Sequence, residues 1–317
     1  MKIAFQMDPI NFVDVNADSS FRLAEEAQAR GHRLFYYSPD KLAFQEGKLI
    51  ARGHKMEVQR VPDHPAILSV EEEVWLEDFD VIWLRQDPPF DMHYITTTHL
   101  LDMVHPKTLV VNDPFWVRNY PEKLLVLNFP ALTPPTTIAR DIETIRTFKE
   151  KHKDIILKPL YGNGGAGVFR LDTNDRNLSS LHELFASFSR EPLIAQKFLP
   201  DVSNGDKRVI LVEGKPVGAI NRIPAKGETR SNMHVGGRPE KVGLTQRDIE
   251  ICDAIGPLLS EKGQIFVGID IIGDYLTEIN LTSPTGIQEL ERFDYINVAS
   301  MVWAAIEKRC KRDHVCL

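Results

Sequence analysis

Residues 155–171 read IILKPLYGNGGAGVFRL, and this stretch decides the fold of the 317-residue chain. Strand-forming residues at 155–158 lead into the glycine-rich run 162–167, and strand-forming residues return at 168–171. The glycine run has the spacing G-x-G-x-x-G, but a dinucleotide-binding turn opens a helix, and here a strand follows. The Lys-Ser/Thr pair that ends a Walker loop is also missing. The stretch therefore predicts a flexible loop between two strands, beside Lys158.

Such a loop can cover a polyphosphate, because its backbone N–H groups are available and Lys158 adds a positive charge. A glycine-rich hairpin turn that binds nothing is the alternative. Farther along the chain, Gln196, Lys197, Phe198 and Leu199 can present backbone groups to an adenine edge, and Asp206 can accept hydrogen bonds from ribose hydroxyls. An ordinary edge strand and a solvated turn aspartate explain these residues equally well.

The first third of the chain has the rhythm of a parallel sheet with helices on both faces. The expected strands are 2–7, 33–37, 81–85 and 108–111, and the expected helices are 19–30 and 96–104. Ligands gather at the carboxyl ends of the strands in such sheets. Asp8-Pro9 and the segment 85–89 stand at two of these ends.

A proline-rich break between 112 and 135 predicts a domain boundary near residue 121. Beyond it we expect helices at 141–152, 178–188 and 246–261, strands at 155–158, 168–171, 193–198, 207–212, 216–223 and 265–272, a long loop at 224–244, and two terminal helices. The predicted organisation is therefore α/β in three parts: an N-terminal parallel unit (1–121), a small lobe carrying the glycine loop (122–200) and a large lobe carrying further polar clusters (201–317).

Composition narrows the class of protein. The formal net charge of −7 disfavours non-specific binding to nucleic acid or to an anionic membrane. We find no apolar run of transmembrane length and no signal sequence, and Cys252, Cys310 and Cys316 form no C-x-x-C pair. A cytoplasmic protein with unpaired thiols is expected. The sequence leaves the oligomeric state open, a homo-oligomer included, and it offers no motif of a nucleophilic hydrolase.

A basic segment and a polar cluster follow in the large lobe. Residues 207–241 contain eight basic and three acidic side chains, including Arg208, Arg222 and Arg230. Arginine matches carboxylate and phosphate groups bidentately, so this segment predicts a receptor for small anions, with a solvated basic loop as the alternative.

Asp270 lies inside an apolar strand, and Glu278 and Asn280 share one face of the returning strand. Two carboxylates and an amide oxygen suit Mg²⁺ bridging nucleotide phosphates, and a structural salt bridge is the alternative. The dipeptide Gly273-Asp274 invites a two-residue turn, but that turn would pair Asp270 with Thr277 and point it away from the other two. We therefore predict a three-residue turn at 273–275, with Gly273 or Asp274 in an unusual backbone conformation, which pairs Asp270 with Glu278 and Gly268 with Asn280.

Taken together, several segments resemble the ATP-grasp ligases, and most closely the prokaryotic glutathione synthetase family. They are 7–10, 18–21, 85–91 (RQDPPFD), Lys123, 155–167, 206–208, 227–230, 236–238 and 270–285 (DIIGDYLTEINLTSPT). The resemblance implies a pre-ATP-grasp domain followed by the two α+β lobes of an ATP-grasp fold. It also implies an enzyme that joins γ-glutamylcysteine to glycine through an acyl phosphate, releasing ADP and phosphate.

The resemblance also implies a role for each matched position. The ATP site would comprise Lys123, Lys158, Gly164, Gly165, Gln196, Lys197, Phe198, Leu199 and Asp206. Arg208 would be the catalytic residue that stabilises the acyl phosphate, and Asp270, Glu278 and Asn280 would carry Mg²⁺, with Mn²⁺ as a substitute. The substrates would be held by Ser19, Arg85, Asp87, Arg222, Arg230, Gly236, Gly237, Ser283 and Thr285.

Two positions depart from the family pattern, which often has an aspartate at Tyr161 and a lysine at Gln86, and the tail 310–317 has no counterpart. One rival is another ATP-grasp carboxylate-amine ligase, of the D-alanine-D-alanine or glutamate-adding type, which would lack the D-P-P-F-D and T-S-P-T segments. The other is a non-catalytic ATP-binding module, which would have no use for a cation such as Arg208 aimed at a transferring phosphoryl group.

Overall fold

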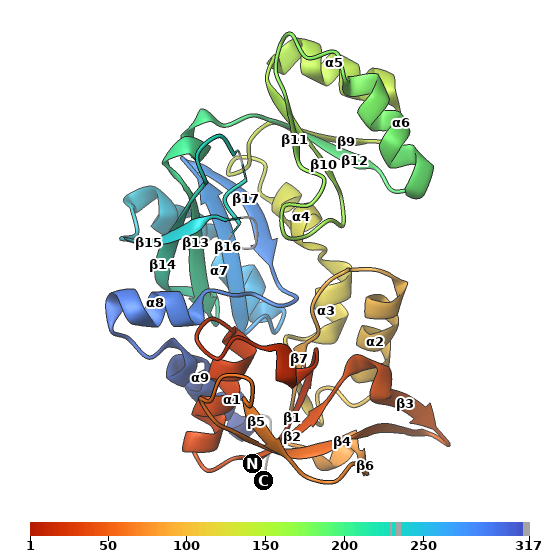
Figure 1. Cartoon of the computed structure of the whole chain (residues 1–317), viewed down its shortest axis with the longest axis vertical. Coiled ribbons are helices and arrows are strands. Elements are labelled where there is room, and N and C mark those ends of the chain that lie inside the picture. Colours follow the sequence, from red (N-terminus) through yellow and green to blue (C-terminus); the bar gives the residue numbers. More distant parts are fainter. Residues whose placement is uncertain (229, 233–235, 313–317) are drawn as a thin grey trace.

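The computed structural model describes residues 1–228, 230–232 and 236–312, so Thr229, Cys316 and most of the tail considered above lie outside the described residues. Figure 1 shows the N-terminal third of the chain at one end, a small lobe at the other end and a large lobe between them. Among the described residues, no helix combines the length and the apolar character needed to cross a membrane.

The N-terminal part is a mixed sheet in the order β3-β4-β2-β1-β7-β8, with β5 and β6 also paired to β4. Its adjacent strands β2, β1, β7 and β8 are parallel, as predicted. Helix α1 covers one face, and α2 and α3 cover the other. The elements are β1 (Lys2–Met7), α1 (Ser19–Ala29), β2 (Arg33–Tyr37), β3 (Leu42–Gln45), β4 (Lys48–Val58), β5 (Ala66–Leu68), β6 (Glu72–Trp75), β7 (Val81–Arg85), α2 (Met92–Asp102), β8 (Leu109–Val111) and α3 (Pro114–Asn119).

The small lobe is an antiparallel sheet in the order β11-β10-β12-β9, backed by two helices that pack on it through Ile145 and Phe185. It follows the short helix α4 (Glu122–Leu125). Its elements are β9 (Thr136–Ala139), α5 (Ile142–His152), β10 (Ile155–Pro159), β11 (Phe169–Leu171), α6 (Leu178–Phe188) and β12 (Leu193–Lys197). The glycine loop joins β10 to the neighbouring strand β11, as the sequence predicts.

The large lobe is an antiparallel sheet in the order β15-β14-β13-β16-β17. Helix α7 packs on one face through Ile251 and Ile255, and α8 packs on the other through Ile287 and Leu290. The elements are β13 (Asp206–Val212), β14 (Lys215–Ile223), β15 (Arg238–Val242), α7 (Gln246–Glu261), β16 (Phe266–Ile272), β17 (Tyr275–Asn280) and α8 (Ile287–Asp294). Strand β15 corrects the expectation of a loop throughout 224–244, because its residues pair with β14.

The last helix, α9 (Val298–Arg312), returns to the N-terminal part. Trp303 is fully buried there, donates from Nε1 to the Leu23 carbonyl at 2.8 Å, and lies against Trp83 at a ring-centroid distance of 5.9 Å. One apolar core therefore runs through α1, β1 and α9 and continues into the large lobe. At the rim of the same contact, Arg30 binds Glu307 at 3.1 Å.

The turn between β16 and β17 combines a wrong prediction with a confirmed one. Asp270 pairs with Glu278 and Gly268 with Asn280, as predicted, but Ile272 pairs with Tyr275 across a two-residue Gly273-Asp274 turn. The register shifts between the two regions, and the extra residue on β17 is Thr277, a β-bulge. Gly273 takes the predicted unusual conformation, with φ +57. The bulge therefore gives the predicted pairing of Asp270 with Glu278, although the turn is one residue shorter than predicted.

Candidate active site

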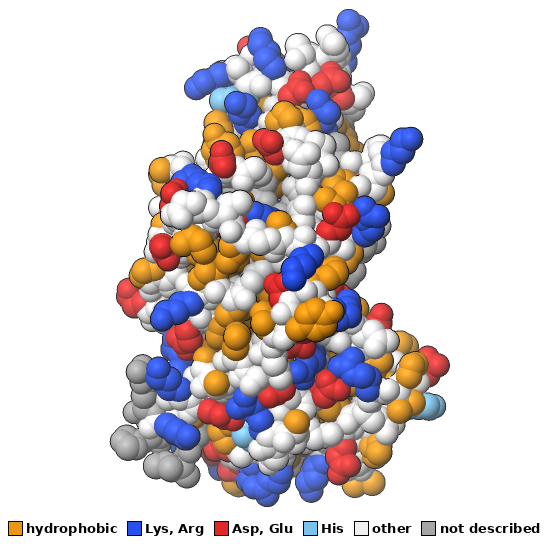
Figure 2. Space-filling view, turned by 90° about the vertical axis from the view of Figure 1, so that its left-hand side faces the viewer, with side chains coloured by type: hydrophobic (Ala, Val, Ile, Leu, Met, Phe, Trp, Pro, Cys, Tyr) orange, Lys and Arg blue, Asp and Glu red, His pale blue; other side chains and the backbone are white. Residues whose placement is uncertain are grey.

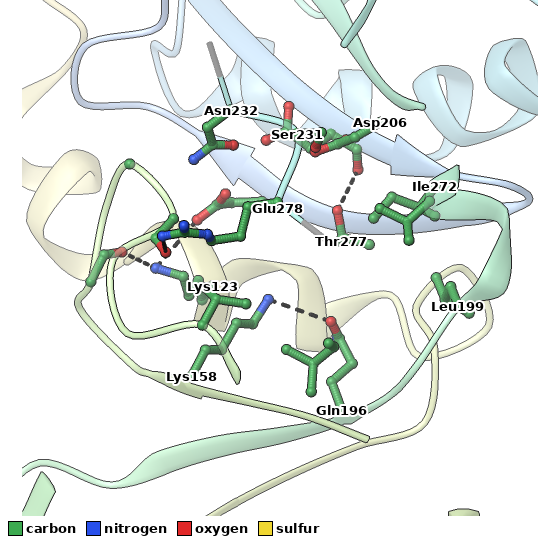
Figure 3. A pocket seen from close by; sticks show the side chains of 18 of the residues that line it. Lys123, Lys158, Gln196, Leu199, Asp206, Ser231, Asn232, Ile272, Thr277 and Glu278 are labelled. Carbon is green, nitrogen blue, oxygen red and sulfur yellow. Dashed lines mark hydrogen bonds and ion pairs between the residues drawn. The ribbon is translucent and has the colours of Figure 1, made fainter. Parts of the chain in front are cut away.

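A cavity of about 140 Å³ lies between the two lobes, below the glycine loop. Its floor comes from β10 and β12 of the small lobe, its opposite wall from β13, β16 and β17 of the large lobe, and one end from Lys123 on α4 (Figure 3). Of the residues assigned from the sequence, it brings together Lys123, Lys158, Gly164, Gly165, Gln196, Lys197, Phe198, Leu199, Asp206, Arg230, Asp270 and Glu278.

Two ammonium groups line this cavity. Lys158 Nζ donates to Gln196 Oε1 at 3.4 Å, and Gln196 Nε2 in turn donates to Thr136 Oγ1 at 2.9 Å. Burial lowers the pKa of Lys158, and the neighbouring charge of Lys123 lowers it further, against the opposing effect of Glu278. Lys123 forms an ion pair with Glu278 at 3.4 Å and donates to the Gly162 carbonyl. Two close cations of this kind favour an anionic ligand, which would relieve their repulsion.

The glycine loop reaches across the cavity toward the large lobe. Gly164, Gly165 and Gly167 all have positive φ angles, which side chains other than glycine rarely adopt. A Cβ added at Gly165 would lie 3.3 Å from Arg230 Cδ and 3.4 Å from Asn232 Nδ2. The loop backbone therefore approaches residues 230–232 so closely that a side chain at Gly165 would press against them.

The acidic wall is built around Asp270. Arg208 binds it through two hydrogen bonds, Nε to Oδ1 at 2.5 Å and Nη2 to Oδ2 at 2.9 Å, and Arg222 Nη2 lies 3.0 Å from Oδ1. Burial by itself would raise the pKa of Asp270, but the two guanidinium groups hold it well below the ordinary range of a carboxyl group. Arg208 and Arg222 do not line the cavity themselves. They contact Asp270, which does.

On the same wall, one carboxylate oxygen of Asp206 has no hydrogen-bond partner among the described residues. Its Oδ2 accepts from Arg222 Nη2 at 2.6 Å and from Ser231 Oγ at 2.8 Å, whereas Oδ1 is buried and has no partner among the described residues. Burial raises the pKa of Asp206, although the charge of Arg222 opposes this. A ligand hydroxyl would satisfy the unpaired oxygen.

The predicted metal set fits a hard cation by its donor chemistry. Asp270 and Glu278 lie opposite each other on adjacent strands, and Asn280 Nδ2 is 3.4 Å from Asp270 Oδ2. Among the described residues, no three His, Cys, Asp or Glu side chains form a cluster suited to a metal ion. The set therefore depends on the amide oxygen of Asn280 as its third donor, which Mg²⁺ accepts and Zn²⁺ seldom uses.

The remaining substrate residues lie in two other places. Arg85, at the end of β7, donates to Ser20 Oγ at 2.8 Å and to the Pro284 carbonyl at 3.0 Å, and Ser283 Oγ is buried with no partner among the described residues. Ser19, the first residue of α1, accepts from Ile287 N at 3.5 Å, Asp87 N, just beyond β7, donates to Asp8 Oδ2 at 2.7 Å, and Thr285 follows Pro284 in the chain. Gly236 and Gly237 lie in the loop between β14 and β15, where a Cβ on Gly237 would come within 1.9 Å of the Ser231 carbonyl oxygen.

The two departures from the family pattern both involve the N-terminal part. Gln86 accepts a hydrogen bond from Gln6 Nε2 at 3.2 Å, and both side chains are buried. The Tyr161 ring lies 5.9 Å from the Phe90 ring, centroid to centroid, so the base of the glycine loop contacts the D-P-P-F-D segment.

Sequence reasoning missed several residues of the cavity. Outside the glycine loop 162–167, which was predicted, they are Ile156, Pro159, Val168, Val202, Ser231, Asn232, Ile272 and Thr277. The apolar members have the same pattern as core residues, so the sequence held no signal for them. Ser231 and Asn232 directly follow Arg230, and this position was the available signal.

Comparisons with known proteins agree with this geometry. The family model of the prokaryotic glutathione synthetase N-terminal domain matches residues 1–118, and that of the corresponding ATP-grasp domain matches residues 122–295. The chain is 58% identical to a glutathione synthetase of Brucella melitensis, over 98% of this chain and 99% of the relative. It is 57% identical to one of Agrobacterium fabrum (98% and 97%) and 43% identical to one of Vibrio parahaemolyticus (98% and 99%).

Solved structures support the fold. A D-cycloserine synthetase superposes with a TM-score of 0.70 at 13% identity, covering 98% of this chain and 99% of the other. A RimK-domain ATP-grasp protein of Sphaerobacter thermophilus gives a TM-score of 0.65 at 17% identity, covering 96% and 99%. The predicted ATP-grasp fold is confirmed, and the chain belongs to the prokaryotic glutathione synthetase family.

Proposed function

We propose that this enzyme, an ATP-dependent ligase of glutathione biosynthesis, joins γ-glutamylcysteine to glycine at the cavity between its lobes. A cysteinyl carboxylate oxygen attacks the γ-phosphorus of ATP and ADP leaves. The glycine amine then attacks the acyl carbon, phosphate leaves and the amine loses a proton. The observation that carries the proposal is the placement of Lys123 and Lys158 opposite Asp270 and Glu278, in a chain of this family. The family match does not favour the other carboxylate-amine ligases.

Each group of residues has a proposed part in this reaction. Lys123, Lys158, Gly164 and Gly165 hold the phosphates, the backbone of 196–199 binds the adenine, and Asp206 Oδ1 accepts from the ribose. Arg208 stabilises the charge that grows on the acyl phosphate and its tetrahedral adduct. The glycine loop, together with the described residues 230–232 that it approaches, limits the entry of water, which would hydrolyse an acyl phosphate.

The substrates have proposed contacts as well. Arg222, Arg230 and the turn at Gly236-Gly237 bind substrate carboxylates, while Ser19, Arg85, Asp87, Ser283 and Thr285 enclose the γ-glutamyl end. Asp270, Glu278 and Asn280 would hold Mg²⁺ or Mn²⁺, which supplies positive charge to the phosphate oxygens. The proposed setting is the cytoplasm, where buried thiols such as Cys252 stay reduced.

The reaction can be tested by following ADP release. We expect release in quantity only when γ-glutamylcysteine, glycine and Mg²⁺ are all present, because the acyl phosphate needs both the carboxylate and the amine to turn over. Glutathione should form in equal amount. Equal turnover with D-alanine alone would favour the rival ligase and reject the proposal.

The phosphate site can be tested separately by nucleotide binding. Replacing Lys158 with Ala is expected to weaken ADP binding by on the order of tenfold, which corresponds to about 1.4 kcal/mol. The reason is that its ammonium lies inside the cavity, where solvent screens it poorly. Calorimetry with the exposed Lys151→Ala variant of the same lobe provides the control. Equal affinities of the Lys158→Ala and wild-type proteins would contradict the assignment.

A further inference from the structure

Glu122 opens α4 and forms an unusual set of contacts for a carboxylate on a four-residue helix. Its Oε1 accepts hydrogen bonds from Leu281 N at 2.9 Å, Thr282 N at 3.1 Å and Thr282 Oγ1 at 2.8 Å. These partners lie about 160 positions farther along the chain. One carboxylate oxygen thus connects α4, which precedes the small lobe, to the residues just after β17.

The bonded segment occupies a critical place in the site. Residues 281–282 follow Asn280, the last of the proposed metal ligands, and they precede Ser283 and Pro284. The Pro284 carbonyl accepts from Arg85, which connects this turn to the N-terminal part. The hydrogen bonds of Glu122 are therefore made between Asn280, a proposed metal ligand, and Ser283, a proposed substrate contact.

The next residue, Lys123, makes the complementary set of contacts. Its ammonium pairs with Glu278 on β17 and donates to the Gly162 carbonyl of the glycine loop. The dipeptide 122–123 therefore attaches to β17 at two levels, through Lys123 to Glu278 and through Glu122 to the residues just beyond Asn280. A displacement of either attachment changes the distance between the phosphate side and the substrate side.

The carboxylate of Glu122 is buried close to a second carboxylate, that of Glu278. Burial raises the pKa of Glu122, and the charge of nearby Glu278 raises it further, so the anion is costly at this position. A neutral amide oxygen could accept the same bonds without repelling Glu278. The carboxylate makes the bonds charge-assisted and hence stronger, which holds the turn at 281–282 more firmly.

We propose that Glu122 is a positioning residue for ligation, which fixes residues 281–285 relative to Lys123 so that the phosphorylated carboxylate and the incoming amine are aligned. This inference rests on the proposed function for its kinetic consequence. Glu122 touches neither nucleotide nor substrate in this role. It acts through the turn that it holds.

The kinetic test uses graded variants. Because a misplacement of about 1 Å can cost on the order of 10²-fold in rate, Glu122→Ala is expected to lower kcat by roughly 10- to 10²-fold. The KM for ATP should change less than about threefold, since Lys158 and residues 196–199 are untouched. Glu122→Gln, which keeps an acceptor oxygen, and Thr282→Val, which loses one donor, should fall between Glu122→Ala and wild type, and Thr282→Ser should match wild type.

The control is Glu213→Ala, which removes a carboxylate bound by Arg309 at 2.5 Å and 2.7 Å, away from the site. It should lower the melting temperature and leave kcat unchanged. A folded Glu122→Ala protein with wild-type kcat would overturn the proposal. If that variant does not fold, wild-type kcat in both Glu122→Gln and Thr282→Val overturns it instead, and graded losses in these two support it.

Hydrogen exchange supplies a readout that does not require ligation. In wild type, ADP with Mg²⁺ should slow exchange in the peptide 278–286, because the phosphate side and this turn are joined through residues 122–123. In Glu122→Gln this nucleotide effect should be smaller, whereas a purely structural role would speed exchange equally with and without nucleotide. If wild type makes no glutathione, the proposed function fails, and the exchange experiment still decides the role of Glu122.

Discussion

Replacing Arg208 with Ala is expected to lower kcat by on the order of 10²-fold or more, the scale of losing one preorganised donor to developing negative charge. Arg208 binds Asp270 and is not among the residues that line the nucleotide cavity, so the KM for ATP should change little. Steady-state kinetics with varied ATP separates the two effects. Loss of ATP affinity with an unchanged kcat would show that Arg208 serves ground-state binding instead.

Arg309→Ala is a suitable control for this variant. Arg309 also forms two hydrogen bonds with one carboxylate, that of Glu213, just beyond the far end of β13. Removing it should destabilise the protein without changing the kinetic constants. The comparison separates the chemical role of Arg208 from the loss of a bidentate ion pair.

Asp270→Asn is expected to have the second large effect. The substitution keeps the shape of the side chain but leaves Arg208 and Arg222 with less negative charge in a buried place. Breaking a buried ion pair in this way costs about 3–5 kcal/mol of unfolding free energy. Activity should also fall by on the order of 10²-fold or more, because a proposed metal ligand loses its charge. Thermal unfolding and kcat measure the two losses.

The loss of stability should depend on pH. Because the pKa of Asp270 is lowered in the folded protein, its contribution is fully present above the unfolded value of about 3.9 and disappears as the pH falls through the folded value. The difference between wild type and Asp270→Asn should therefore be constant at neutral pH and shrink only in strong acid. Asp248→Asn, at a buried carboxylate paired with Lys207, is the control that should lose stability and keep kcat. A wild-type kcat for Asp270→Asn would contradict its proposed role.

The sequence predicted the elements whose own side chains determine their structure. Strands β1, β2 and β7 are short, mostly apolar runs that are buried except at the first residue of β1 and of β2, and the structure gives them the predicted bounds. Strand β4 was missed because exposed positions and charged residues interrupt its 11 residues, and β15 because it contains Pro239. These strands form through pairing with their neighbours, which a local pattern does not reveal.

In the candidate site, too, some residues could be predicted from the sequence and others could not. Asp270 was recognisable because burying a charge requires a partner or a ligand, and Lys158 because it ends the strand that leads into the glycine loop. The apolar lining residues Ile156 and Ile272 look like core residues in the sequence. Glu122 could not be identified, because its hydrogen-bond donors belong to a distant turn. The Thr277 bulge was missed because a longer turn explains the same register equally well.

The packing of α9 on the N-terminal part links the folding of this part to the synthesis of residues 298–312. The Leu23 carbonyl and the rings around Trp83 obtain Trp303 as a partner only when the last helix has been made. At roughly 5–20 residues per second, the ribosome needs on the order of tens of seconds to synthesise the residues between 121 and 298. During this interval the first 121 residues expose the apolar surface that α9 later covers.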